Sequence, residues 1–466
     1  MEMTYPKIKK AFFLLAAFLG VLFFCLYHDN KVFVYDASAY WNLGRAFWEN
    51  GFSINNYPKT IRGYVLPLIL GFSAKVGTVA FGSEYIVYWI LYGSLTVVLT
   101  MILFPKLIGA EFWTKRYFVC GGGTLLLFLY FWDFLLIYPL SDLPALVLYI
   151  TILLSLKSLA LCEGKKLKDK VLVAFMLGLV SYIAYNVRTV YLYPIALAWV
   201  IYVGYCAFMR RKELPLLLIA AIMGMIPVAI PQILINLNHY DRFSAAVYTS
   251  YAGESNLFIA QLVAGIRVPR YETFVGDASV YPLPSVYFVN KLGNYLYQEQ
   301  QIHTIGEYIN WLLNHFIEAI AIYTEHLISG ITIFWRQGYL TTLKVDTVAF
   351  FLNCGLFILA GFGLVSSKSK WRANVKLEII VPILFAVLPS LMAMFGALEV
   401  RFFLCVYLLV YTYVFLKLDY KKLGQYIKNN YVEVTLVAIV ILFVWCMSAS
   451  QLLSEIEHGM WLLSGK

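Results

Sequence analysis

Asp36 is the residue whose type and position most directly suggest chemistry. It opens an aromatic segment that runs to Gly44, shortly after the first apolar run, Ala11 to Tyr27. Lysines precede that run, so the positive-inside rule predicts a cytoplasmic N-terminus and an extracytoplasmic Asp36. A pure anchor has no need of a carboxylate at the outer membrane surface. We therefore expect chemistry at the boundary between lipid and water.

Further acids and arginines are predicted at the same membrane level. Each stands in a loop or turn that the apolar pattern places on the outer face: Arg62, Asp142, Arg188, Glu399 and Arg401. A wide outer loop could gather these side chains around Asp36. The sequence thus predicts one polar region built from distant parts of the chain.

The elements that must position this region are membrane helices. Hydrophobic residues make up 61% of the 466 residues and charged residues only 13%, about half the charged share of soluble domains. Apolar runs of about 17–25 residues can each cross a bilayer as a helix. We count about eleven, beginning with Ala11–Tyr27 and continuing near Glu84, Tyr117, Leu143, Val171, Val190, Leu214, Asp346, Leu377, Phe402 and Val432. The predicted fold is an all-α integral membrane bundle, a single polytopic domain over 1–466.

The net charge of +10 is explained by membrane orientation, so we expect no nucleic-acid partner. Basic clusters fall at 106–116, 165–170, 210–212, 368–376 and 417–428. All lie on the predicted inner side.

Two long extracytoplasmic loops, 28–83 and 236–345, contrast with short connections elsewhere. In the first, Asp36–Trp48 has the spacing of an amphipathic helix, and Tyr64–Ala80 reads as an interfacial or re-entrant segment. In the second, 306–335 is assigned to helices packed on the outer face. If that stretch spans the membrane, the count becomes twelve.

These pieces together resemble a known family. The Asp36 segment, the sequence Arg62-Gly63-Tyr64-x-x-Pro67 and the turn Leu140-Ser141-Asp142-Leu143-Pro144 follow the order seen in polytopic GT-C glycosyltransferases. The resemblance is to the bacterial branch related to protein O-mannosyltransferases and the lipid A aminoarabinose transferase. It covers the first two hundred residues well. The C-terminal half matches in outline, through its long loop and the Glu399-x-Arg401-Phe-Phe turn.

The resemblance implies a sugar donor linked to a polyprenyl phosphate and an acceptor outside the cytoplasm, namely a cell-surface glycan, glycolipid or protein. Asp36 would be the catalytic base of an inverting transfer. Guanidinium groups suit the phosphate leaving group, and the candidates are Arg62, Arg188 and Arg401, with Arg267 and Arg270 less favoured. Tyr40, Tyr64 and Glu399 would support them.

Asp142 would orient the acceptor or join a divalent-metal site. The turn lacks the Asp-x-Asp pair of metal-dependent relatives, so the need for a metal stays open. In a bacterium the protein would lie in the plasma membrane.

Structural alternatives stand beside these roles. Asp36 and Asp142 also fit helix N-caps, and Arg188 and Arg401 could reach lipid headgroups from span ends. Four residues of the second loop are of types that can bind a metal: His315, Glu318, Glu325 and His326. No pair has the His-x-x-x-His spacing of a helical zinc site, so we favour structural roles for them. For the whole chain, a transporter or flippase and a polysaccharide polymerase are the competing functions.

Overall fold

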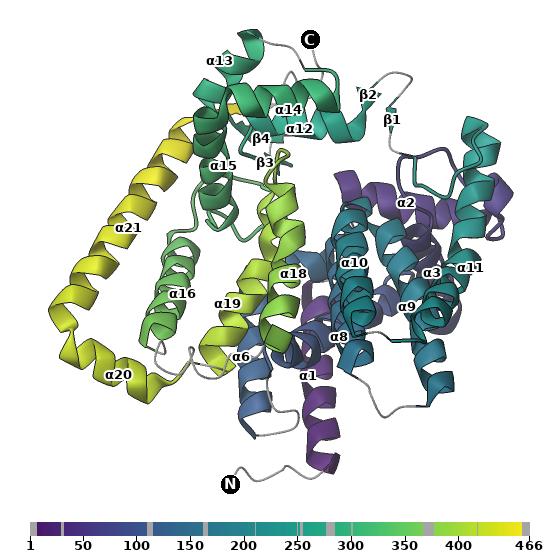
Figure 1. Ribbon diagram of the computed structural model, residues 1–466, viewed down its shortest axis with the longest axis horizontal. Coiled ribbons are helices and arrows are strands. Elements are labelled where there is room, and N and C mark those ends of the chain that lie inside the picture. Colours follow the sequence, from purple (N-terminus) through teal and green to yellow (C-terminus); the bar gives the residue numbers. More distant parts are fainter. Residues whose placement is uncertain are drawn as a thin grey trace. The chain divides into compact units, whose positions relative to one another are not determined.

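The computed structural model of the chain describes residues 7–28, 32–109, 115–161, 166–209, 211–248, 250–251, 255–275, 285–299, 302–366, 377–416 and 418–458. These residues fold almost entirely into helices (Figure 1). They form two compact units. Unit 1 comprises Met1–Leu125, Leu135–Thr249 and Lys376–Ala386, and unit 2 comprises Leu126–Phe134, Ser250–Val375 and Val387–Lys466. The basic cluster 368–376 lies outside the described residues.

Unit 1 contains the N-terminal helices. They are α1 (Lys7–His28), α2 (Tyr35–Glu49), the short η1 (Ile54–Asn56), α3 (Val65–Phe81), α4 (Ile86–Val98), the π-helical η2 (Leu99–Leu103), α5 (Phe104–Leu107), α7 (Phe134–Ile137), α8 (Asp142–Leu161), α9 (Leu167–Val187), η3 (Thr189–Tyr191), α10 (Leu192–Phe208) and α11 (Leu214–Tyr240). Three helices contribute residues to both units: α7, whose first residue Phe134 belongs to unit 2, and two not named above, α6 (Lys115–Trp132) and α18 (Leu377–Ala393).

Unit 2 combines helices with short strands. They are β1 (Ser250–Tyr251), β2 (Ser255–Asn256), α12 (Leu257–Arg267), β3 (Arg270–Thr273), β4 (Ser285–Phe288), α13 (Lys291–Glu299), α14 (Ile305–Asn314), α15 (Phe316–Gly330), α16 (Thr347–Ser366), η4 (Val400–Phe403), α19 (Leu404–Leu416), α20 (Tyr420–Asn429), α21 (Tyr431–Ser454) and β5 (Ile456–His458). β3, β4 and β5 form an antiparallel sheet in that order, with Arg270 opposite Phe288 and Val286 opposite His458.

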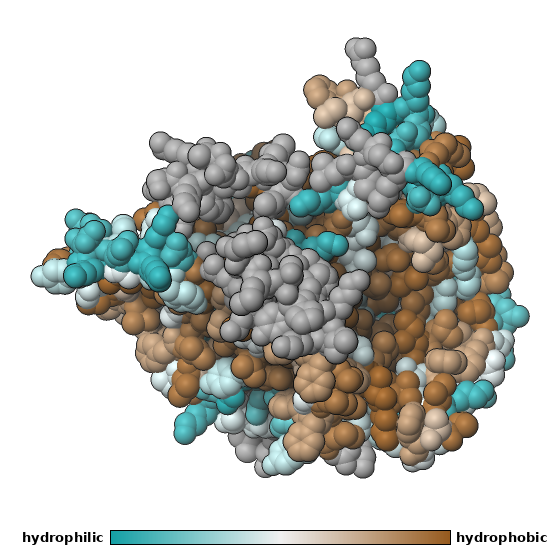
Figure 2. Space-filling model, turned by 90° about the horizontal axis from the view of Figure 1, so that it is seen from below, coloured by the Kyte–Doolittle hydropathy of each residue, from teal (hydrophilic) through white to brown (hydrophobic). Residues whose placement is uncertain are grey.

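Eight helices in the described part of the chain are long and apolar enough to cross a membrane. They are Ala11–His28, Ile86–Leu107, Asp142–Ala160, Leu167–Val187, Thr189–Phe208, Leu214–Tyr240, Thr347–Ser366 and Tyr431–Ser454. Hydrophobic residues also cover much of the described surface in Figure 2, as expected where lipid is the solvent. The prediction of a helical multi-pass membrane protein is confirmed.

The predicted count of eleven spans stays a prediction. The spans expected near Tyr117 and Leu377 correspond to shorter apolar helices, Tyr117–Trp132 and Ile380–Ala393. The span expected near Phe402 is part of a helix pair bent by 88°, which would raise the count to nine if it crosses as one. The stretch 306–335 holds two separate helices, α14 and α15, and neither is among the eight.

Helices α9 and α11 pack closely because glycines remove side chains at their contact. A Cβ atom on Gly178 would lie 1.8 Å from the carbonyl oxygen of Ala221, and one on Gly224 would lie 1.9 Å from that of Phe175. Near the start of both helices, Lys170 Nζ donates to Glu213 Oε1 at 2.5 Å. The pair therefore has a fixed register along its length.

Helix α2 lies crosswise to the long helices of unit 1 and crosses α3 at a second glycine contact (Figure 1). A Cβ atom on Gly71 would lie 2.3 Å from the carbonyl oxygen of Gly44. This close crossing holds the helix that carries Asp36 directly against the helix that follows Arg62.

The α9–α11 contact predicts that Gly178→Ala is destabilising. The added methyl group cannot fit against the Ala221 backbone, and overpacking of this kind costs about 1–3 kcal/mol. We expect a lower midpoint of thermal unfolding in detergent. The matched control is Gly204→Ala in α10, where a Cβ atom meets nothing within 4 Å and alanine favours the helix. An equal fall for both variants would contradict the packing argument.

Candidate active site

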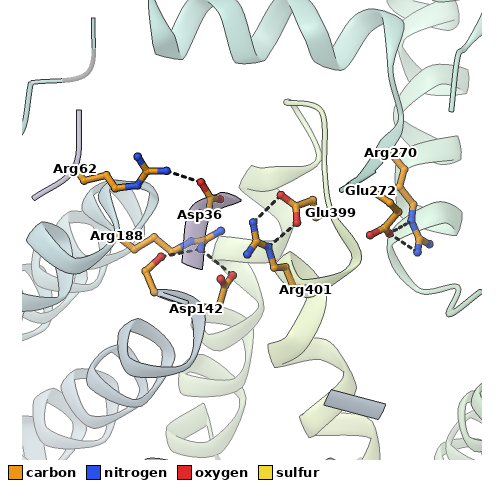
Figure 3. A network of polar contacts seen from close by, with 9 residues as sticks. Asp36, Arg62, Asp142, Arg188, Arg270, Glu272, Glu399 and Arg401 are labelled. Carbon is orange, nitrogen blue, oxygen red and sulfur yellow. Dashed lines mark hydrogen bonds and ion pairs between the residues drawn. The ribbon is translucent and has the colours of Figure 1, made fainter. Parts of the chain in front are cut away.

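Asp36 lies in the first turn of α2 and forms an ion pair with Arg62, which stands shortly before α3 (Figure 3). The side chain of Asp36 is 46% exposed and that of Arg62 is 24% exposed. The guanidinium carbon of Arg62 also lies 5.0 Å from the ring centre of Tyr40, one turn further along α2. The N-cap of α2 is Val34, so Asp36 is not the cap residue. Its carboxylate is accessible and sits beside a cation.

The backbone next to Arg62 is fixed by Asn186, near the end of α9. Asn186 Oδ1 accepts a hydrogen bond from the backbone N–H of Val65 at 2.9 Å. Gly63 is needed here, because a Cβ atom would lie 2.0 Å from the carbonyl oxygen of Asn186. Tyr64 is buried, and its hydroxyl donates to the carbonyl of Val228 at 3.0 Å. The Arg62-Gly63-Tyr64 sequence therefore has a structural reason at two of its three positions.

A chain of buried amides extends this anchor into α11. Asn186 Nδ2 donates to Gln232 Oε1 at 2.9 Å, and Gln232 Nε2 donates to Asn236 Oδ1 at 3.1 Å. Asn236 Nδ2 then donates to the carbonyls of Ser244 and Ala246, each at 2.7 Å. Since buried amides are costly when unpaired, this chain ties the Arg62 segment firmly to α9 and α11.

A second acid–arginine pair lies in unit 1 (Figure 3). Asp142 opens α8, and its Oδ1 lies 2.8 Å from Arg188 Nη1, which follows α9. The same nitrogen donates to Ser141 Oγ at 3.1 Å. This pair is more enclosed, with side-chain exposures of 6% for Asp142 and 18% for Arg188. Snorkelling alone does not account for Arg188, because an acid engages it.

Aromatic rings join α2 to the turn before Asp142. Trp41 stacks on Tyr85 with ring centres 5.3 Å apart, and Phe33 contacts both Trp41, at 5.0 Å, and Tyr138, at 6.5 Å. Two buried tyrosines of α4 hold the turn by its carbonyls: Tyr88 donates to Leu136 and Tyr92 to Leu140. The helix that carries Asp36 and the turn that precedes Asp142 thus share one aromatic framework.

Unit 2 holds two buried acid–arginine pairs of its own. Arg401 binds both carboxylate oxygens of Glu399 through two nitrogens, at 2.6 and 2.7 Å (Figure 3). Two nitrogens of Arg270 instead converge on one oxygen, Glu272 Oε1, each at 2.6 Å. Arg270 is fully buried and also donates to the carbonyls of Ser329 and Thr332. Glu399 and Arg401 stand only two residues apart, so this is a local ion pair within one turn.

The two pairs of unit 2 are neighbours. The backbone N–H of Tyr271 donates to the carbonyl of Leu398 at 2.9 Å, which joins β3 to the segment leading into η4. Burial raises the pKa of Glu272, which the positive charge of Arg270 partly offsets, and Glu399 raises it further. These four side chains form a compact, electrically balanced group.

Arg267 lies elsewhere in unit 2. Its Nε donates to Asn294 Oδ1 at 3.0 Å, and its guanidinium carbon lies 4.7 Å from the ring centre of Tyr297. Burial lowers its pKa.

Two of the four residues considered as metal ligands, His326 and Glu325, have other hydrogen-bond partners. His326 is buried with its Nε2 2.8 Å from the carbonyl of Gly265, and burial lowers its pKa to about 4. Glu325 accepts a hydrogen bond from Asn290 Nδ2. In the part of the chain that the structure describes, no three His, Cys, Asp or Glu side chains are placed to hold a metal ion.

The chain of amides from Asn186 through Gln232 to Asn236 is not predicted by the sequence analysis. Gln232 and Asn236 are four residues apart within an apolar run, so they share a helix face. That spacing is a local sequence signal for a contact between their side chains. No signal marked Asn186 as their partner.

No family model, no curated protein and no solved structure matches this chain. The roles of the site residues therefore rest on geometry and on chemistry.

Glu325 predicts a pH dependence of stability. Burial raises its pKa from 4.5 to about 7, Asn290 lowers it in part, and Glu455 raises it further. The folded state thus keeps a proton that the unfolded state has released, so the free energy of unfolding falls as pH rises from about 4.5 to about 7. Thermal unfolding of Glu325→Gln should show a weaker fall across this range.

Glu318→Gln, on the same helix, is the control and should keep the wild-type pH dependence. If both variants follow the wild-type curve, Glu325 is not the group responsible.

Proposed function

We propose that this chain is an integral-membrane glycosyltransferase of the GT-C type. It would transfer one sugar from a polyprenyl-phosphate donor to an acceptor hydroxyl outside the cytoplasm, on a cell-surface glycan, a glycolipid or a protein. In a bacterium the enzyme would lie in the plasma membrane with Asp36 on the outer side. The observation that carries the proposal is the accessible carboxylate of Asp36 held beside Arg62, with a second acid–arginine pair on the same framework.

In the proposed reaction, Asp36 accepts the proton of the acceptor hydroxyl while that oxygen attacks the anomeric carbon. A new carbon–oxygen bond forms, and the bond between the anomeric carbon and the phosphate oxygen breaks on the opposite face. The sugar is therefore transferred with inversion. The proton passes from Asp36 to solvent, and the polyprenyl phosphate leaves as an anion.

Arg62 and Arg188 suit the departing phosphate, because guanidinium groups are always protonated and can donate two parallel hydrogen bonds. A phosphate that takes over the Arg62 guanidinium would also release the Asp36 carboxylate to act as a base. Arg188 would stay tied to Asp142, and Asp142 would orient the acceptor. Both arginines keep part of their surface exposed.

Arg401 and Arg270 are weaker candidates for the donor phosphate. Each is buried and already grips a glutamate through two nitrogens. Moving either one to a ligand would leave a carboxylate buried without its partner, which is costly. We assign them, with Glu399, to holding unit 2 together.

Asp36→Asn should abolish transfer while leaving the fold intact. Asparagine keeps the shape of the side chain but cannot accept the proton, and loss of a general base costs about 10²–10⁴-fold in rate. The measurement is transfer from radiolabelled polyprenyl-phosphate sugars to an envelope extract, using protein reconstituted in lipid. Asp241→Asn is the control, since Asp241 is an exposed aspartate at the end of α11. Transfer by Asp36→Asn at the wild-type rate would remove Asp36 from the mechanism.

Arg62→Lys should raise KM for the donor about tenfold, because lysine keeps the charge but loses the paired donors. Arg45→Lys is the matched control, as Arg45 lies on α2 and faces Glu84 at 3.8 Å. A fall in kcat with KM unchanged would instead make Arg62 a positioning residue for Asp36.

A further inference from the structure

A stack of two tyrosines with a cation on each side lies where α11 ends. The rings of Tyr240 and Tyr248 are stacked, with centres 3.9 Å apart. Lys59 Nζ lies 5.2 Å from the centre of the Tyr240 ring, and the guanidinium carbon of Arg242 lies 5.4 Å from that of Tyr248. All four residues belong to unit 1, and we call them the Lys59–Arg242 stack.

The stack is anchored to its surroundings. The hydroxyl of Tyr240 donates to the carbonyl of Thr60 at 3.0 Å, which fixes the loop that carries Lys59. Next to Tyr248, the backbone N–H of Val247 donates to the hydroxyl of Tyr185 at 2.8 Å. These two hydrogen bonds fix the backbone next to each end of the stack.

The two cations are exposed and carry no acidic partner. The side chains of Lys59 and Arg242 both lie on the surface of the described part of the chain. No Asp or Glu lies within 4.0 Å of either charged group in the part of the chain that the structure describes. In this respect they differ from Arg62 and Arg188, which each have a carboxylate beside them. An anion from outside the chain could therefore pair with both cations.

The position of the stack indicates which anion. Tyr240 is the last residue of α11, one of the eight helices long and apolar enough to cross a membrane. The end of such a helix lies at the level of the lipid headgroups, where tyrosines are also enriched. Phosphate groups of lipids are the anions concentrated at that level.

An apolar path leads along α11 toward the same place. Ile230, Leu234 and Leu237 recur at helical spacing and are 50%, 41% and 38% exposed, so they face lipid acyl chains. Phe243, just beyond the helix, is 82% exposed. A lipid whose chains lie on α11 would therefore present its headgroup near Arg242.

We infer that the Lys59–Arg242 stack binds the phosphate headgroup of an anionic membrane phospholipid. Two unpaired positive charges favour a headgroup with net negative charge over a zwitterionic one, which carries its own ammonium group. The stacked rings keep the two charges apart and in place through cation–π contacts. This inference does not depend on the proposed transferase activity.

The test measures lipid binding to the full chain by native mass spectrometry, with phosphatidylglycerol and phosphatidylcholine as the two probes. Phosphatidylglycerol should bind the wild type more tightly. Lys59→Gln or Arg242→Gln should each weaken its binding about fivefold, and the double variant about thirtyfold, as expected for basic residues at a membrane surface. Binding of phosphatidylcholine should not change. Added salt should reduce the preference for phosphatidylglycerol.

Lys75→Gln is the matched control, since Lys75 is an exposed lysine of unit 1 that lies over a single ring, that of Phe52. It should bind phosphatidylglycerol as the wild type does. Tyr248→Leu should act like the loss of one cation, because the stack no longer holds Arg242.

Two outcomes would overturn the inference. One is wild-type binding by the double variant, or an equal loss in Lys75→Gln, which would make the effect one of general charge. The other is competition by free glycerol phosphate at the concentration at which the lipid binds, which would assign the site to a soluble phosphate.

Discussion

The polar region of unit 1 depends on one close contact, that of Gly63 with Asn186. The side-chain oxygen of Asn186 accepts a hydrogen bond from the backbone N–H of Val65. The backbone carbonyl oxygen of Asn186 occupies the space that a side chain at position 63 would need. A membrane protein has little water to satisfy a backbone group freed from this contact. The chain around Arg62 therefore has one favourable path, and the pairing with Asp36 follows from it.

The acid–arginine pairs of this chain differ in burial, and burial determines whether a pair can exchange its partners. A buried pair contributes little net stability, because removing both charges from water costs about as much as their attraction returns. Its value is specificity, since any other arrangement leaves a charge unpaired. Glu272 and Arg270 fit this role, joined to the backbone of neighbouring segments. Asp36 differs, as half-exposed carboxylates can change partners at low cost.

Much of the fold could be predicted from hydropathy, and little of the site's geometry could. Eight of the predicted spans appear as long apolar helices, because membrane helices satisfy their own backbone bonds and leave a local signal in the sequence. The residues of the site could also be named, since acids and arginines are rare in such a chain. Their partners could not. Asn186 meets Val65 across 121 positions, and no local pattern encodes a contact of that range.

The N-cap alternative for Asp36 shows why local rules fail at this point. An aspartate before a helical pattern ordinarily caps it, yet α2 begins one residue earlier, with Val34 at the cap. The carboxylate is then drawn to Arg62, whose position is set by α3 and α9 rather than by its neighbours in sequence. A helix start that omits its cap forgoes about 1 kcal/mol. Without a capping role, the carboxylate faces a cation and solvent, which is the arrangement that the proposed base requires.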